Sequence, residues 1–195
     1  MKKTSMILCG MMLLASSAMA QVKVIAHRGH WNSQGAAQNS IAAMQNAKKA
    51  DVWGSEFDVH ITTDGTVVVN HDDDIHGIII ENAKYADIKN LKLANGEPIA
   101  TLKSYLEAGK KLAPMQLILE IKAYQTPERE DRCVKAYLDL VKAAGIDYYD
   151  GALLKNPNWI KESHDLGMKV NVWTIDDIST THSSTTASNT FRKLP

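Results

Sequence analysis

The sequence has little cysteine, no net charge and no long hydrophobic run, and each absence excludes a class of protein. Two cysteines among 195 residues exclude a disulfide-rich scaffold and a four-cysteine zinc site. The 22 basic and 22 acidic residues balance, so nothing in the charge indicates binding to nucleic acid or to an anionic membrane. The remaining composition, 45% hydrophobic and 23% charged, is typical of a globular chain of about one domain.

The first twenty residues have the pattern of a secretory signal peptide. Lys2 and Lys3 precede the apolar run 6–15, and small residues end the segment at Ala20. This is the order of a cleavable signal, and the run is far shorter than the roughly 20 residues that span a bilayer. A core helix and a lipoprotein leader are the less favoured alternatives. We therefore expect cleavage after Ala20, export to the periplasm or the exterior, and no stable insertion in a membrane.

Hydrophobic patterns along the rest of the chain alternate between strands and helices. Strands are expected at 22–26, 54–62, 66–70, 116–121, near 147 and at 169–174, and helices at 40–50, 126–145 and 157–167. This alternation is typical of βα units around a parallel sheet. Residues 72–100 are interpreted as polar and irregular.

The end of the chain has a different composition. Half of the residues in 178–195 are serine or threonine, and such a segment buries too little to offset its ordering entropy. We therefore expect one barrel domain over 21–177 and a disordered tail over 178–195.

Polar residues gather in four short stretches at expected strand ends. The stretches are His27-Arg28-Gly29, Glu56-Phe57-Asp58, Asn70-His71-Asp72 and Glu120-Ile121-Lys122. In a βα barrel the active site is assembled from the carboxyl ends of the strands. The four stretches are therefore expected to meet at one pocket.

Three acidic residues among them are candidate metal ligands. Glu56 and Asp58 are two positions apart on one strand and so project from the same face. Two such carboxylates repel each other unless a cation joins them, and Glu120 offers a third ligand. Carboxylate oxygens with open positions suit Mg²⁺ or Ca²⁺ rather than zinc. A solvated strand face with no metal is the alternative.

Two histidines are candidates for acid–base catalysis. His27 and His71 each adjoin another polar group, and histidine titrates near working pH. Arg28 can bind a phosphate with two hydrogen bonds, and Lys122 adds a point charge for the same anion. Together with a metal these residues suit phosphoryl transfer. Strand-end histidines with purely structural roles are the alternative, and His60, on the face of Glu56 and Asp58, is the main rival.

The motifs resemble those of the glycerophosphodiester phosphodiesterase family. The chain reads IAHRGHW, then EFDVHITTDGTVVVNHD, then LILEIK, and later VNVWTIDD. The family pattern has His-Arg-Gly, then Glu-x-Asp-x-x-x-Thr-x-Asp-Gly-x-x-Val-x-x-His-Asp, then Glu-Ile-Lys and a Trp-containing strand. The match runs from about Val24 to Asp177. It implies a TIM barrel that cleaves glycerophosphodiesters to an alcohol and glycerol 3-phosphate.

The resemblance also implies a role for each candidate residue. It makes His27 and His71 the general acid and base, Glu56, Asp58 and Glu120 the ligands of a divalent cation such as Ca²⁺ or Mg²⁺, Arg28 and Lys122 the phosphate-binding residues, and Trp173 part of the pocket wall. In the mechanism usually proposed for the family, the neighbouring glycerol hydroxyl attacks phosphorus, and water then opens the cyclic phosphate.

Three departures from the family pattern bear on the fold. Gln38 stands where the family's Pro-Glu-Asn-Thr has a carboxylate, so one contact in the pocket is expected to change. Without its first twenty residues the chain falls below the roughly 200 residues at the lower end for TIM barrels. The serine- and threonine-rich tail stands where the last helix and strand would close the barrel. We therefore expect an α/β, TIM-type (β/α) barrel that is incomplete or gapped. An inactive or truncated barrel that at most binds glycerophosphoryl groups is the alternative to an active hydrolase.

Overall fold

The computed structural model describes residues 23–122, 124, 126–144, 148–150, 169–171 and 191–194. Several predictions lie outside these residues: the signal peptide over 1–20, the helix over 157–167, Trp173, and most of the tail. Within the described part, no helix is both long and apolar enough to cross a membrane.

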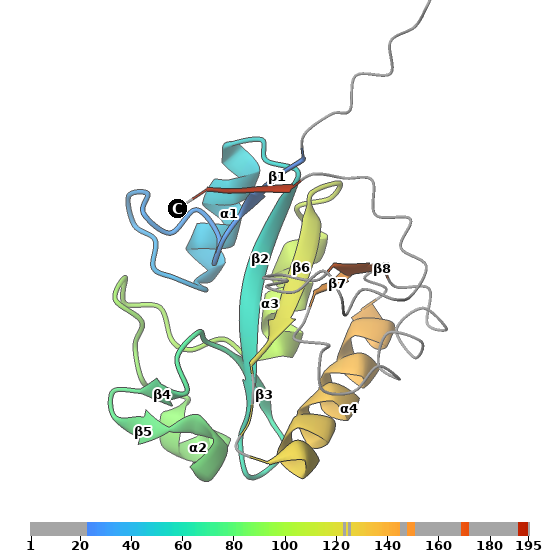
Figure 1. The fold of residues 1–195 in the computed structure, drawn as a ribbon. Helices are drawn as coiled ribbons and strands as arrows, with labels where there is room; N and C mark the ends of the chain where they lie inside the picture. The colour runs from blue at the N-terminus through green and yellow to red at the C-terminus, as the bar shows by residue number, and fades with distance from the viewer. Residues whose placement is uncertain are drawn as a thin grey trace, which may run out of the picture.

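Strands and helices alternate along most of the described chain (Figure 1). The strands are β1 Lys23–Ala26, β2 Gly54–Ile61, β3 Val67–Val69, β4 Asp74–Ile75, β5 Ile78–Ile79, β6 Gln116–Ile121, β7 Tyr148–Asp150, β8 Lys169–Asn171 and β9 Phe191–Leu194. The helices are α1 Ile41–Lys49, the 3-10 turn η1 Ile80–Asn82, α2 Tyr85–Ile88, α3 Leu102–Lys110 and α4 Pro127–Ala144. Each strand expected from the sequence is present, and those whose bounds were predicted differ by a few residues at most.

β2 is the centre of the main sheet. It pairs in parallel with β1 and β6 and antiparallel with β3. In the ladder with β6, Glu56 is level with Ile118 and Asp58 is level with Glu120. The parallel register therefore brings the carboxyl ends of β1, β2 and β6 to the same edge of the sheet.

The helices begin at the capping residues that the sequence offers. Ser40 caps α1 by accepting a hydrogen bond from the Ala43 amide, and Thr101 caps α3 through the Ser104 amide. These side chains satisfy amides that the first helical turn leaves without partners. Pro127 opens α4 with its φ already suited to a helix.

The main core lies between the outer face of the sheet and helices α1, α3 and α4. Phe57 of β2 contacts Tyr105 of α3 with their ring centroids 4.7 Å apart. Tyr137 and Cys133 of α4 are fully buried in the same core. The Cys133 thiol lies 3.3 Å from the Tyr124 hydroxyl, which donates a hydrogen bond to it.

Residues 72–100 were expected to be irregular, and this prediction is wrong. They contain β4, β5, η1 and α2, and Figure 1 shows β4, β5 and α2 together at its lower left. Their buried side chains form a second small core with Val68 of β3: Ile75, Ile80, Ala83, Ile88 and Ile99. Each element has only two to four residues, which is too short for a hydrophobic period to show in the sequence.

The tail also differs from expectation where it is described. Phe191–Leu194 forms β9 and pairs in parallel with all four residues of β1. This pairing supplies hydrogen-bond partners to the backbone groups on the free edge of β1. It does not depend on the side-chain pattern, so the sequence does not predict β9. The described strands fall into three separate sheets, since β4–β5 and β7–β8 are not paired with β2's sheet. The described strands thus belong to three separate ladders.

Candidate active site

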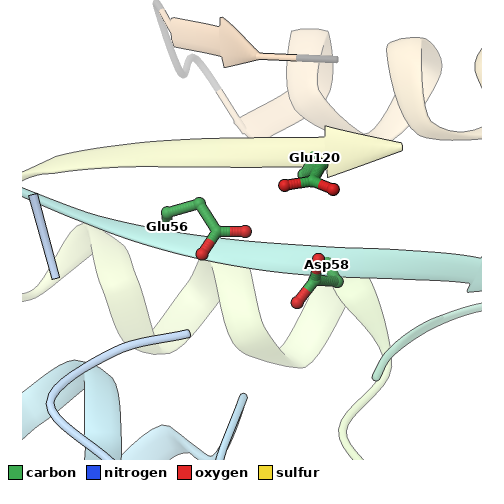
Figure 2. A group of neighbouring side chains, drawn as sticks. All are labelled: Glu56, Asp58 and Glu120. Carbon is green, nitrogen blue, oxygen red and sulfur yellow. The ribbon is translucent and has the colours of Figure 1, made fainter. Parts of the chain in front are cut away.

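Three carboxylates converge from the two neighbouring strands β2 and β6. One oxygen from each of Glu56, Asp58 and Glu120 lies within 4.8 Å of the other two. Figure 2 shows the three side chains directed toward one another. The expected convergence is therefore confirmed, because parallel pairing sets Asp58 level with Glu120 and the two-residue spacing puts Glu56 on the same face.

Asp58 is fully buried and is held by residues from three different segments. Its Oδ2 accepts a hydrogen bond of 2.8 Å from the Asn39 side chain, and its own amide donates to Asn39 Oδ1 at 3.1 Å. Its Oδ1 lies 2.7 Å from Lys122 Nζ. A buried carboxylate needs such partners to stay ionised, so Asn39 and Lys122 fix both its position and its charge.

Glu56 is the least satisfied of the three carboxylates. Its Oε2 accepts the Arg28 amide at 2.7 Å, while its buried Oε1 has no hydrogen-bond partner among the described residues. Burial and the neighbouring Asp58 raise the pKa of Glu56 to about 8, although the Arg28 amide opposes this. Without a cation, burial and Asp58 therefore favour the protonated form of Glu56.

The donor set fits a hard divalent cation. It offers three carboxylates whose ligand oxygens lie within 4.8 Å of one another, and the buried Oε1 of Glu56 accepts no hydrogen bond from the described residues. A cation there would replace the proton on Glu56 and remove the repulsion that raises its pKa. Glu56, Asp58 and Glu120 would hold it, and their role as ligands remains a prediction.

Lys122 already places one positive charge beside these carboxylates. Its ammonium lies 2.7 Å from both Asp58 Oδ1 and Glu120 Oε1. Burial lowers the pKa of Lys122, but the two ion pairs outweigh burial and raise it above its ordinary value. Lys122 is therefore a permanent cation at the site, directed at the same oxygens that a metal would use.

Arg28 adopts a strained backbone at the end of β1. Its φ is +58°, a left-handed conformation that costs a non-glycine residue about 1–2 kcal/mol. Hydrogen bonds hold it there: its amide donates to Glu56 Oε2 at 2.7 Å, and its carbonyl accepts the Asn39 amide at 3.0 Å. Strain that the surroundings stabilise is typical of functional residues.

The Arg28 guanidinium links the other parts of the site. It donates to Gln38 Oε1 at 2.6 Å and to Nε2 of His71, while its Nε lies 3.9 Å from Asp58 Oδ2. At Gln38, where the family motif has a carboxylate, Arg28 bonds a neutral amide oxygen. Arg28 consequently has only neutral acceptors at its two terminal nitrogens.

The hydrogen bonds of His71 define its protonation. A guanidinium can only donate, so His71 Nε2 must accept, and the ring proton lies on Nδ1. That Nδ1 is 2.7 Å from Asp72 Oδ1 and donates to it. With these roles, the Nε2 lone pair of His71 is directed at the Arg28 guanidinium. The second candidate, His27, lies with its Nε2 3.9 Å from Glu56 Oε2.

The structure also adds residues that the motifs did not single out. Asn39 holds Asp58 with two hydrogen bonds, and Asp72 orients the His71 ring. His60, the rival histidine, is buried against Tyr124, and burial lowers its pKa. Asn39 is level with the asparagine of the family's Pro-Glu-Asn-Thr. That match could have identified Asn39 as a site residue from the sequence alone.

Comparison with known proteins agrees with this geometry. The family model "Glycerophosphoryl diester phosphodiesterase family" matches residues 27–143. This range contains every candidate residue above except Trp173. The chain belongs to this family. A search of curated proteins gave no match.

Solved structures of family members share the fold. The chain is 35% identical to a glycerophosphodiester phosphodiesterase from Parabacteroides distasonis, covering 80% of this chain and 85% of that one with a TM-score of 0.62. A phosphodiesterase from Oleispira antarctica, solved with the product sn-glycerol-3-phosphate, is 21% identical over 80% of this chain and 86% of its own, with a TM-score of 0.59. An enzyme from Thermotoga maritima is 26% identical over 78% and 62% of the two chains, also at 0.59. The predicted α/β fold of TIM-barrel type is thereby confirmed.

Proposed function

We propose that this protein hydrolyses glycerophosphodiesters to an alcohol and glycerol 3-phosphate with the help of a divalent cation. The observation that carries the proposal is the convergence of three carboxylates beside Arg28, Lys122 and two histidines. Membership of the glycerophosphoryl diester phosphodiesterase family supports the substrate class.

Binding of the phosphodiester falls to the two basic residues. Arg28 can turn its terminal nitrogens from Gln38 and His71 to a phosphate without abandoning a charged partner. Lys122 offers a second positive charge from the opposite side of the carboxylates. A cation held by Glu56, Asp58 and Glu120, Ca²⁺ or Mg²⁺, would supply electrophilic stabilisation of the charge that develops on the phosphoryl oxygens.

His71 and His27 exchange protons with the reacting oxygens. His71 Nε2 accepts the proton of the glycerol hydroxyl next to the phosphate, and that oxygen attacks phosphorus. The bond from phosphorus to the alcohol breaks, and His27 donates a proton to the departing oxygen. In the second half His27 takes a proton from water, which opens the cyclic phosphate, and His71 returns its proton to the glycerol oxygen. Both histidines are thus restored.

The test is an assay of glycerol 3-phosphate release from several glycerophosphodiesters, with and without Ca²⁺ or Mg²⁺. His27→Ala and His71→Ala should each lower kcat about 10²–10⁴-fold, the usual worth of a positioned proton-transfer group. His76→Asn is the matched control and should leave kcat unchanged. His76 lies in the turn between β4 and β5, outside the site, where its ring bonds the Lys92 carbonyl. Near-normal turnover by His71→Ala would contradict the mechanism. Binding of glycerophosphodiesters without turnover would favour the alternative of an inactive barrel.

Export is a second part of the proposal. It rests on the signal pattern of residues 1–20. The exported protein should begin at Gln21, which N-terminal sequencing of the periplasmic or secreted fraction measures. Full-length protein that stays in the cytoplasm would refute it.

A further inference from the structure

His60 is the third polar side chain on the inner face of β2, after Glu56 and Asp58. It is only 4% exposed, yet it is not one of the three residues whose ligand atoms converge. Its Nε2 instead lies 3.2 Å from the backbone carbonyl oxygen of His71. Since a carbonyl can only accept, Nε2 carries the proton and donates it.

This hydrogen bond continues the β2–β3 ladder beyond its last strand residue. The ladder ends with Val69 opposite Val59, and the Asn70 amide then donates to the Asp58 carbonyl at 3.0 Å. At the next residue the chain turns toward the site, and the side chain of His60 takes the place of a backbone partner. The His71 backbone is therefore tied to the same strand that carries the carboxylates.

His71 is then held at three points. Its carbonyl accepts from His60, its Nδ1 donates to Asp72, and its Nε2 accepts from Arg28. The contacts with Asp72 and Arg28 orient the His71 ring. They can hold Nε2 toward the site only if the Cα of His71 is also held in place. The Asp72 side chain is 74% exposed, whereas the His60 side chain that donates to the His71 carbonyl is 4% exposed, so the contact from His60 is the more rigid of these two.

We propose that His60 is a positioning residue for His71, fixing the backbone from which the acid–base ring extends. The inference rests on the proposed function, since it takes His71 as the proton acceptor. His60 itself touches no reacting atom. Its role lies in the donated hydrogen bond and not in the volume of its ring.

Substitutions that separate the hydrogen bond from the volume test this. His60→Phe keeps a ring against Tyr124 but removes the donor, and His60→Leu removes both. His60→Gln keeps a donor that can reach the same carbonyl. We expect the Phe and Leu variants to lose about 10–100-fold in kcat with KM within about threefold, as a misplaced catalytic group does. His60→Gln should recover most of the lost kcat, and His76→Asn, which breaks a histidine-to-carbonyl bond outside the site, should lose nothing. Equal losses in the Gln and Phe variants, or no loss in either Phe or Leu, would overturn the proposal.

A second measurement does not depend on turnover. The ¹⁵N signals of the His71 ring in the full chain should show one Nδ1-protonated form in the wild type and in His60→Gln, and a broadened or shifted signal in His60→Phe. An unchanged His71 signal in both donor-less variants overturns the positioning role whatever the activity. A changed signal in a protein that has no phosphodiesterase activity in any cation supports the positioning role and refutes the proposed function.

Discussion

The two faces of β2 are equally buried, yet they serve opposite purposes. The outer face carries Phe57 and Val59, which pack against the helices. The inner face carries Glu56, Asp58 and His60, all at most 4% exposed. Alternate residues of one eight-residue strand thus provide the apolar burial that stabilises the fold and the charged groups that destabilise it.

The comparison shows that apolar packing on the outer face offsets the unfavourable burial of carboxylates on the inner face. Burying carboxylates without full partners is unfavourable, and the raised pKa of Glu56 is a direct sign of it. The opposite face compensates through contacts such as that of Phe57 with Tyr105. Substitutions on the inner face should therefore change chemistry with little loss of stability, and those on the outer face should do the reverse.

The largest effect is expected for Glu56→Gln on the inner face. The amide has the size of the protonated carboxyl, so at about pH 4.5 the metal-free Tm should change by no more than about 2 °C. Loss of the ligand charge should lower turnover by about 10²-fold or more, because a bound cation is worth several kcal/mol in charge stabilisation. The stabilisation by added Ca²⁺ or Mg²⁺ seen in thermal melts of the wild type should vanish. An unchanged cation response would show that Glu56 is not a ligand.

Phe57→Ala on the outer face should lower stability and leave the response to the cation intact. Removing a fully buried ring costs about 3–5 kcal/mol, which is roughly 10 °C in Tm for a chain of this size. Below the new Tm the cation should still raise stability, because the carboxylates are intact. Differential scanning fluorimetry with and without cation measures both. A smaller loss for Phe57→Leu is the control, and loss of the cation response in Phe57→Ala would break the separation of the two faces.

A smaller effect concerns pH. The pKa of Glu56 is about 8 in the folded protein against an ordinary 4.5, so the folded state keeps a proton that the unfolded chain loses. The resulting stabilisation is complete below about pH 4.5 and disappears as the pH rises to 8. The metal-free Tm should therefore fall by several degrees between pH 5 and 8, and this part of the slope should be absent in Glu56→Gln. Equal slopes in the two proteins would refute the assignment.

The smallest effect is expected for Gln38→Glu, at the edge of the site. A carboxylate beside Arg28 would compete with the phosphate for the guanidinium, which now bonds a neutral oxygen at this point. The interaction is partly exposed and worth about 1 kcal/mol, so KM should rise about threefold to tenfold with kcat nearly constant. Gln38→Met, which removes the contact without adding charge, is the control. A lower KM in Gln38→Glu would contradict this account.

The sequence predicted the strands and the carboxylates well because both follow from spacing. Alternation fixes the face of Glu56 and Asp58, and the continuous apolar run of 116–121 predicts the parallel neighbour that brings Glu120 to them. It could not predict β4, β5 and α2, which are stabilised by a small core assembled from scattered isoleucines such as Ile80 and Ile88.

The contacts within the site were equally out of reach of periodic patterns. The left-handed backbone of Arg28 and the paired hydrogen bonds of Asn39 depend on tertiary contacts between β1, β2 and the loop that joins β1 to α1. The hydrogen bond from His60 to His71 likewise needs the β2–β3 register. Residue types indicated which groups take part, and only the fold shows which atoms meet.

The ammonium of Lys122 helps to balance the negative charge of the carboxylates beside it. Before any cation binds, Lys122 and Arg28 balance two carboxylates and a proton neutralises Glu56, so the buried site carries no net charge. A divalent cation held by the three carboxylates would take the place of that proton and leave one positive charge in excess. A phosphodiester carries a single negative charge, and the neutral amide of Gln38 keeps the excess intact. Among Lys122, Arg28 and the three carboxylates, a bound cation would therefore leave the one positive charge that a phosphodiester cancels, before the proton that His27 donates is counted.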